Sequence, residues 1–460
     1  RTDKMLTRKI IMAFLIISFA AGAAAAAPGP MPSAAPRSAD MAPAVDDAAL
    51  AALLVKAAAN NPQIAAAAQK TAAAEAQVSQ AQAKMGPKAS SGMGALWMRD
   101  GISKNVGLPG MGMLNVPILG SHTYAAAVGL TQVIYAGGSL TAQKQAAQLA
   151  RDAAAAQERR TAQSVENAVC RAYYTLRCAQ AKELVAEEAV SLSKSHMAQA
   201  EKLLKAGVVA KNDVLRSKVA VASAELDLIR AQNGSAVAFT ALRRAVGADL
   251  PDGLAETRPL NKILTAAEGQ PPYGEARGAA ELAMERREEL KAYALLSGQA
   301  EKLARAAQGQ MLPQILGAVG YFAADDKFFP SEQSEPAAAV GLYWNFYDSG
   351  EMRAKTNEAK AKAKELLFML DDMKNAIRME VTQADLNLKS AHSRLVVAAR
   401  QAGEAREDYR IATRRYAESV GTNLDTLDAR LALTNSLTEL ATAMYDIKMA
   451  EADLRYAIGE

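Results

Sequence analysis

Two carboxylates near the C-terminal end of the chain, Asp425 and Asp428, have a spacing that could carry a function. Residues three apart share one face of a helix. If copies of the chain met around an axis, each carboxylate would form a ring that attracts cations and resists close approach of the helices. Alternatively, Asp425 caps or complements a helix N-terminus while Asp428 faces solvent. The spacing leaves both interpretations open.

Residue types that catalyse reactions form no recognisable site in this sequence. Cys170 and Cys178 lie eight residues apart on one predicted helix, too far for a disulfide, and we expect them to be packing thiols. The histidines His122, His196 and His392 are scattered. No acid–base pair, phosphate-binding loop or nucleophile motif stands out. We therefore expect no enzyme, no cofactor and no metal site.

Four methionines cluster around one predicted loop: Met93, Met98, Met111 and Met113. Thioether sulfurs are soft ligands that suit Cu(I) or Ag(I). In a loop, however, methionines more often fill gaps between other side chains. The second interpretation is favoured here.

A helical seam organises the second half of the chain. Between Ile377 and Tyr416, apolar or aromatic residues recur at alternating steps of four and three. This 3.5-residue period over five heptads indicates a long helix of the left-handed coiled-coil type. A second seam, from Val165 to Leu204, lies 212 residues earlier. The chain is therefore an internal duplication.

The duplicated unit predicts the domain organisation. The offset of 212 residues holds without a gap from 128–247 to 340–459. We predict a first repeat at 46–247, a linker at 248–278 and a second repeat at 279–460. Each repeat consists of a helix, two strands, a long helix of about 100 Å and a returning helix. The first helix is expected to run unbroken from residue 47 to residue 84.

Strands are predicted at about 88–99 and 123–136 in the first repeat, and at about 313–323 and 337–348 in the second. Bulky apolar side chains alternate with small or polar ones, on the same parity in both repeats. The Gly- and Pro-rich stretch 100–121 between the first two strands is expected to be an exposed loop. Aromatic residues concentrate around these strands, as in membrane-crossing strands. Two soluble hairpins packed on helices are the alternative.

The N-terminal region predicts export. Residues 5–27 have the basic start, apolar centre and small-residue end of a secretory signal peptide, and 28–45 reads as a flexible segment. Beyond them no apolar run is long enough for a spanning helix, so a membrane form would cross as strands. The formal net charge of +4 over 460 residues indicates no nucleic-acid partner.

Four strands cannot close a barrel, and open sheet edges are not tolerated in lipid. Closure therefore requires several chains, and three copies would supply twelve strands. The predicted fold is mainly α with membrane β-strands: a trimeric twelve-stranded barrel continued by a helical tunnel.

Two turn motifs carry a family resemblance. They are Gly207-Val-Val-Ala-Lys-Asn-Asp213-Val-Leu215 and Tyr416-Ala-Glu-Ser-Val-Gly421-Thr-Asn-Leu-Asp425-Thr-Leu-Asp428-Ala429. With these motifs, the sequence resembles the TolC-like outer-membrane efflux protein family (outer membrane factors) across essentially the whole mature chain. The resemblance implies a homotrimeric channel in the outer-membrane lipid, with its helical tunnel in the periplasm.

The resemblance also implies roles for single residues. Asp425 and Asp428 match the aperture carboxylates of the family. Tyr416 and Asp213 match a Tyr–Asp pair that is bonded in the closed state, although Tyr416 could simply end the seam. One member of the family has Arg at the position of Gly421 and Gly at the position of Ser419. Without the Arg, a charge-assisted hydrogen bond would be missing, so the closed state would be held differently or less firmly here.

The exposed hairpin tips would, by the same resemblance, dock a periplasmic adaptor: Gly207, Val208, Val209, Val420 and Gly421. A turn that needs a positive φ explains both glycines without any partner. The implied function is the passive exit duct of a tripartite efflux or type I secretion system for drugs, metals or proteins. An inner-membrane transporter would supply the energy. The alternative is a non-conducting periplasmic coiled-coil scaffold.

Overall fold

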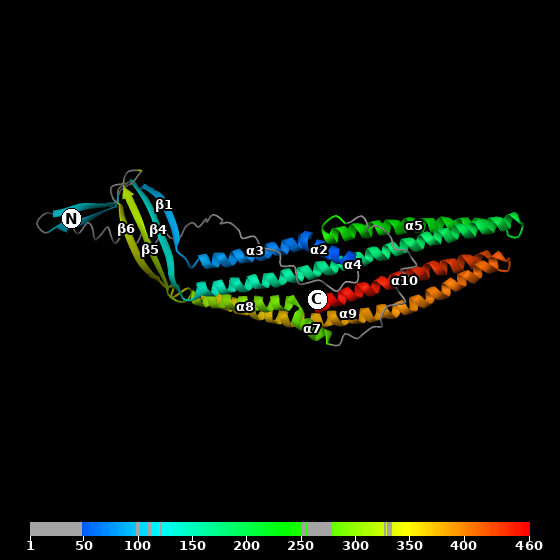
Figure 1. The fold of residues 1–460 in the computed structure, drawn as a ribbon. Coiled ribbons are helices and arrows are strands. Elements are labelled where there is room, and N and C mark those ends of the chain that lie inside the picture. The colour runs from blue at the N-terminus through cyan, green and yellow to red at the C-terminus, as the bar shows by residue number, and fades with distance from the viewer. Residues whose placement is uncertain are drawn as a thin grey trace. The chain divides into compact units, whose positions relative to one another are not determined.

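The computed structural model describes residues 48–97, 102–108, 112–119, 122–250, 254, 278–325, 328 and 334–460. The predicted signal peptide at 5–27, the flexible segment at 28–45 and most of the linker at 248–278 lie outside these residues. Figure 1 shows the order of the elements along the chain. Those elements are α2 (Ala48–Asn60), α3 (Pro62–Ala83), β1 (Lys88–Trp97), β2 (Ile102–Leu108), β3 (Gly112–Leu119), β4 (His122–Ala136), α4 (Ser139–Lys205), α5 (Lys211–Val246), α7 (Ala279–Arg286), α8 (Glu288–Gly309), β5 (Gln314–Asp325), β6 (Ser334–Tyr343), α9 (Glu351–Ala417) and α10 (Asn423–Ile458).

The two halves of the chain repeat the same helix lengths. The long helices α4 and α9 each contain 67 residues, and the returning helices α5 and α10 each contain 36. Residues with positive φ also recur 212 residues apart: Gly137 and Ser349, Gly138 and Gly350, Gly207 and Ser419, and Gly247 and Gly459. The duplication therefore extends to the backbone conformation of the turns.

The helix expected to run unbroken from residue 47 to 84 is two helices, which corrects that prediction. Pro62 has no N–H to continue the helical bonding, so α2 ends at Asn60 and α3 begins at Pro62. The Asn61 side chain accepts a hydrogen bond from Gln63 N at 2.8 Å. The second repeat has a break at the corresponding place, where Arg287 separates α7 from α8. Arg287 is buried there and pairs with Glu289 and Glu380.

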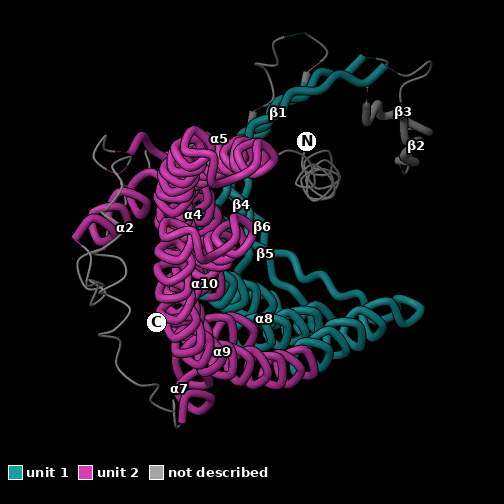
Figure 2. Tube along the Cα trace, turned by 90° about the vertical axis from the view of Figure 1, so that its right-hand side faces the viewer, with its two compact units in different colours: residues 1–36, 72–152, 294–367 teal, residues 37–71, 153–293, 368–460 magenta. Residues whose placement is uncertain are grey.

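Two compact units make up the chain, and Figure 2 colours them separately. One unit contains the strands with the adjoining parts of α3, α4, α8 and α9; its described residues lie within 72–152 and 294–367. In this unit β1, β4, β5 and β6 form an antiparallel four-stranded sheet in the order β1-β4-β5-β6. Strands β2 and β3 pair with each other as a separate hairpin.

The register of the four-stranded sheet separates its side chains into two kinds of face. Val128 is opposite Tyr321 and Leu130 is opposite Val319, and all four side chains are exposed. Side chains alternate between faces along a strand, so the intervening residues share the other face. That face has Gly129 opposite Gly320, where a Cβ on Gly320 would lie 2.7 Å from Val128 O. One face is thus bulky and apolar, and the other is small.

Two strand predictions need correction. Strand β6 ends at Tyr343, not near residue 348, because its partner β5 begins at Gln314, which is already paired with Tyr343. The Trp344 indole instead donates to Met311 O at 3.1 Å. The stretch 100–121, expected to be a loop, contains the β2–β3 hairpin. Its glycine and proline content concealed the pairing.

The described residues of the second unit lie within 48–71, 153–293 and 368–460, and the predicted seams form its core. The α9 seam is buried against α10 and part of α4; Ile377, Val381, Leu388 and Leu395 are among its buried members. The α4 seam is buried at Val165, Val169 and Leu176 against α2 and α5. The periodicity therefore identified the packed face of both long helices.

Among the described helices, none is both long enough and apolar enough to cross a membrane.

Candidate functional site at the helical turns

The turn between α4 and α5, here called the first turn, is closed by Gly207 in the left-handed region with φ 74°. Its backbone donates from Gly207 N to Leu204 O and from Val208 N to Leu203 O, both at 3.0 Å. These bonds satisfy carbonyls at the end of α4. Helix α5 then begins after Ala210, whose side chain cannot cap it. The first turn is therefore held by backbone bonds.

The turn between α9 and α10, the second turn, places Ser419 in the left-handed region with φ 62°. Gly421, for which a positive φ was expected, does not adopt one, so that explanation is wrong for Gly421. Close packing favours a small residue there instead. A Cβ at Gly421 would lie 3.0 Å from Arg415 Cβ and 3.2 Å from Tyr416 N.

Asp425 belongs to a capping box at the start of α10. Its backbone N–H donates to Thr422 Oγ1 at 3.1 Å, and its Oδ2 accepts from Thr422 N at 3.1 Å. Hydrogen bonding by Thr422, through its side chain and then its backbone N–H, lowers the pKa of Asp425. Asp425 and Asp428 are both exposed. The capping alternative is thus realised for Asp425, while an aperture role for the two carboxylates stays a prediction.

Tyr416 packs in a small apolar cluster with Ala200 and Val214, and only 3 % of it is exposed. Its hydroxyl has no hydrogen-bond partner among the described residues. The bond to Asp213 implied by the resemblance is therefore not formed in this structure. Burial, followed by the nearby negative charge of Asp213, raises the pKa of Tyr416.

Asn423, the first residue of α10, joins the two turns. Its Oδ1 lies 2.7 Å from His196 Nε2 on α4 and accepts from Ser217 Oγ on α5 at 3.3 Å. Its Nδ2 donates to Asp213 O on α5 at 3.0 Å. Asn423 is 4 % exposed, and His196 and Ser217 are buried as well. This cluster, hereafter the Asn423 cluster, was missed by the sequence reasoning.

Further side chains enclose the Asn423 cluster. The His196 ring lies 4.9 Å from the Tyr416 ring, centroid to centroid. Thr426 donates to Ala412 O at 3.4 Å, and Arg430 is buried one turn further along α10. Burial lowers the pKa of His196; the bond to Asn423 opposes this shift, and the charge of Arg430 adds to it. At neutral pH the buried imidazole is therefore uncharged.

The predicted docking residues are only partly at the surface. Val208 is 52 % exposed and Val420 is 69 % exposed, and Gly207 is also exposed. Val209 is half-buried and packs against the Tyr416 cluster, and Gly421 is half-buried as well. The tips therefore present one exposed valine each.

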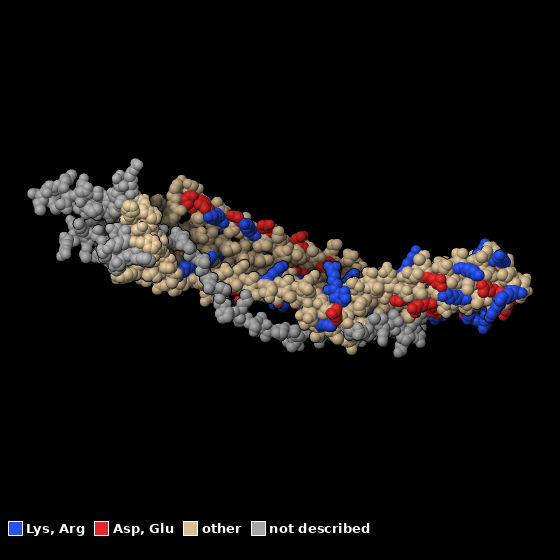
Figure 3. Space-filling view, turned by 90° about the horizontal axis from the view of Figure 1, so that it is seen from above, with Lys and Arg blue, Asp and Glu red and all other residues tan. Residues whose placement is uncertain are grey.

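The charges around the two turns differ. Figure 3 shows basic and acidic side chains intermixed at the end of the second unit where the α4–α5 and α9–α10 hairpins reverse direction. Around the second turn, the two basic residues Arg414 and Arg415 are outnumbered by three acidic ones, Glu418, Asp425 and Asp428. The first turn has a basic surface of exposed residues: Lys202, Lys205, Lys211 and Arg216.

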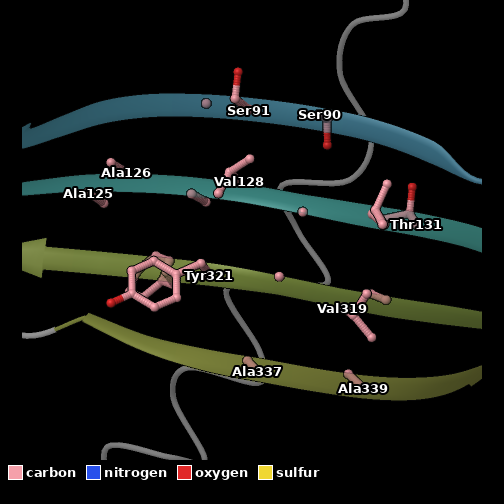
Figure 4. A pocket seen from close by; sticks show the side chains of 17 residues that line it. Ser90, Ser91, Ala125, Ala126, Val128, Thr131, Val319, Tyr321, Ala337 and Ala339 are labelled. Carbon is pink, nitrogen blue, oxygen red and sulfur yellow. The ribbon is translucent and has the colours of Figure 1, made fainter.

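A hollow lies on the four-stranded sheet of the other unit. Its lining consists largely of small residues, and Figure 4 shows Ser90, Ala125, Ala337 and Ala339 among them. Met93 is exposed on β1. The side chains of Met98, Met111 and Met113 lie outside the described part of the chain, so the structure leaves the methionine cluster untested.

Comparison with known proteins identifies the family. No curated protein matches the sequence. Solved structures with the same fold include the outer-membrane channel OprN, with 20 % identity, 90 % of each chain covered and a TM-score of 0.74. Others are VceC of Vibrio cholerae, with 19 % identity, 89 % of this chain and 96 % of that chain covered and a TM-score of 0.72, and the open state of MtrE of Neisseria gonorrhoeae, with 19 % identity, 89 % of each chain covered and a TM-score of 0.68.

OprN and MtrE are described as outer-membrane channels. A sequence model described as "Outer membrane efflux protein" matches residues 53–248 and 279–460, which is most of the chain. The chain therefore belongs to the outer membrane efflux protein family.

Proposed function

We propose that three copies of this chain form an outer-membrane channel whose helices continue as a duct through the periplasm. The observation that carries the proposal is the exposed apolar face of the four-stranded sheet. Val128, Leu130, Val319, Val340 and Leu342 are all exposed on it, with Val340 76 % exposed. A soluble protein rarely exposes so large an apolar patch, whereas lipid would cover it.

The sheet edges support a trimer. In the described sheet, β1 and β6 each have one neighbouring strand, so each leaves backbone groups unpaired. Unpaired groups are not tolerated in lipid. Pairing β6 of one copy with β1 of the next around a threefold axis would satisfy both edges and give twelve strands. The small face, with Gly129 and Gly320, would then line the pore.

Exposed apolar residues on two helices of the second unit support the same assembly. On α5 they are Leu215, Val219, Leu226 and Ile229; on α9 they are Met379, Leu386, Val396 and Val397. Their helical spacing predicts second seams, distinct from those already buried within the chain. We propose that these seams pack against neighbouring copies and form the wall of the duct.

In this proposal the duct is passive. A periplasmic adaptor binds the tips at Gly207, Val208, Val209, Val420 and Gly421, and an inner-membrane transporter supplies the energy for efflux or type I secretion. Asp425 and Asp428 would form carboxylate rings at the narrow end. The proposed repeats are 46–247 and 279–460.

The test is to purify the protein from outer membranes in detergent, measure its mass and record its conductance in planar lipid bilayers. We expect a trimer that forms cation-preferring channels. A monomer that dissolves without detergent and never conducts would instead support a periplasmic scaffold, and would contradict the proposal.

A further inference from the structure

We infer that the Asn423 side chain is the latch that holds the two turns of one chain together in the closed duct. The inference rests on the proposed function and adds the group that regulates it. Asn423 belongs to the second turn, and all three of its side-chain partners belong to the first hairpin: His196 on α4, and Ser217 and the Asp213 carbonyl on α5.

The geometry of the amide makes this contact specific. An amide oxygen only accepts and an amide nitrogen only donates. Asn423 Oδ1 therefore requires a proton on His196 Nε2. The Ser217 hydroxyl donates to the Asp213 carbonyl at 2.9 Å and, at 3.3 Å, is the second donor to Asn423 Oδ1. The nitrogen faces a backbone carbonyl, that of Asp213. No rotation of the amide satisfies all three partners except the one observed.

Burial gives the latch its strength. Asn423, His196 and Ser217 are each more than nine-tenths buried, so water does not replace a broken bond in place. Moving the second turn away from the first hairpin breaks all three bonds together. Such a movement is required if the turns of one chain separate when the duct opens.

Tyr416 and Gly421, the other two candidates in the second turn, form no side-chain hydrogen bond to the first hairpin among the described residues. The Tyr416 hydroxyl is buried without a partner among the described residues, so it holds nothing in this state. Gly421 has no side chain, and its surroundings at Arg415 and Tyr416 leave little room for one. Among the described residues, Asn423 thus forms the side-chain hydrogen bonds between the two turns, beside the apolar packing of Tyr416.

The test compares two Asn→Leu changes in the full-length trimer. Asn423→Leu removes both polar atoms at nearly constant volume. Asn212→Leu makes the same change at an exposed position of the first turn. We expect Asn423→Leu to raise the fraction of time spent in the high-conductance state in planar bilayers by about fivefold or more. Asn212→Leu should conduct as wild type does.

A milder variant guards against misfolding. Ser217→Ala removes one donor to Asn423 Oδ1 and should raise the same fraction by a smaller factor. If Asn423→Leu fails to assemble, Ser217→Ala decides the question. If the wild-type protein conducts and both variants gate as it does, the latch is overturned but the proposed function remains intact. A wild-type protein that never conducts would overturn both.

Discussion

The two turns have the same backbone plan but different side chains. Both place a left-handed residue at equivalent positions, Gly207 in the first and Ser419 in the second. The first turn then starts its helix without a side-chain cap, at Ala210. The second starts with the Thr422–Asp425 capping box. Of the two turns, the second thus has the side-chain cap and the first does not.

This difference suggests a division of labour. The first turn is basic and has no side-chain cap, features that suit a surface that adapts to a partner. The second turn has a side-chain cap, and Asn423 forms hydrogen bonds from it to the first hairpin. Changes at the second turn should therefore affect local stability and gating, while equivalent changes at the first should have small effects. The following predictions test that contrast.

Tyr416→Ala should have the largest effect on the stability of the turn region. It removes a buried aromatic ring and should destabilise the second turn by about 3 kcal/mol. The equivalent first-turn residue, Leu204, is only half-buried, so Leu204→Ala should cost less. Hydrogen exchange of amides in the two turns measures both values.

Tyr416→Phe separates packing from hydrogen bonding at the same position. Because the hydroxyl has no partner in the described structure, this change should alter stability by less than about 0.5 kcal/mol. A loss well above that value would mean that the hydroxyl is bonded, to Asp213 or to another group.

Replacing Asp425 and Asp428 together by Asn should reduce cation preference and divalent-ion block of single channels several-fold. The proposed trimer would lose about six negative charges at its narrow end. The first turn carries Asp213 and Arg216 at the equivalent positions, whose charges cancel. Asp213→Asn is therefore the matched control, and we expect a smaller change. Unaltered ion selectivity in the double variant would reject the aperture assignment.

Acidification should weaken the second turn through His196. Burial lowers the pKa of His196 below its usual 6.5, with Arg430 on α10 and Tyr416 on α9 as its titratable neighbours. The stabilisation is fully present above pH 6.5 and is lost as pH falls through the lower folded-state pKa. The protection factors of amides at residues 416–426, which compare their exchange rates with those of an unstructured chain at the same pH, should therefore be lower at pH 5 than at pH 7.

His196→Gln should remove this part of the pH dependence, because Gln keeps a donor for Asn423 and does not titrate. His392→Gln, on α9 outside the Asn423 cluster, should leave it unchanged. Equal pH dependence in wild type and His196→Gln would show that other groups are responsible.

Thr422→Ala should destabilise the start of α10 by about 1 kcal/mol, because it removes the acceptor for Asp425 N. The converse change in the first turn, Ala210→Ser, offers α5 a cap that it lacks and should stabilise it by a similar amount or less. Hydrogen exchange of the amides at the N-terminal end of α5 and at the N-terminal end of α10 measures both. A destabilised α5 in Ala210→Ser would contradict the comparison.

The fold could be predicted where one period or one residue type decides the outcome. Heptad spacing located the buried faces of α4 and α9, and the 212-residue offset predicted equal long helices. The end of β6 could not be predicted, because it depends on where β5 begins. The prolyl break at Pro62 could have been predicted, since the missing N–H is visible in the sequence.

The candidate site was less accessible to sequence reasoning. The motifs drew attention to Asp425, Tyr416 and Asp213, but not to Asn423 or His196. Asn423 becomes important only because helices from the other repeat bring a donor, a hydroxyl and a carbonyl to it. No local pattern contains that information. The duplication offered one signal, because Asn423 replaces Lys211 at the equivalent position of the first repeat.

A further small effect is predicted for the two left-handed residues. At φ 62°, the Cβ of Ser419 lies unfavourably close to the backbone, whereas Gly207, at φ 74°, has no Cβ. Ser419→Gly should therefore stabilise the second turn, by no more than about 1 kcal/mol, because glycine also gains entropy in the unfolded chain. Gly207→Ser should destabilise the first turn by a similar amount. Because the changed residues lie outside the Asn423 cluster, neither variant should alter gating. A gating change in Ser419→Gly as large as that in Asn423→Leu would show that backbone strain, rather than the Asn423 amide, controls the second turn.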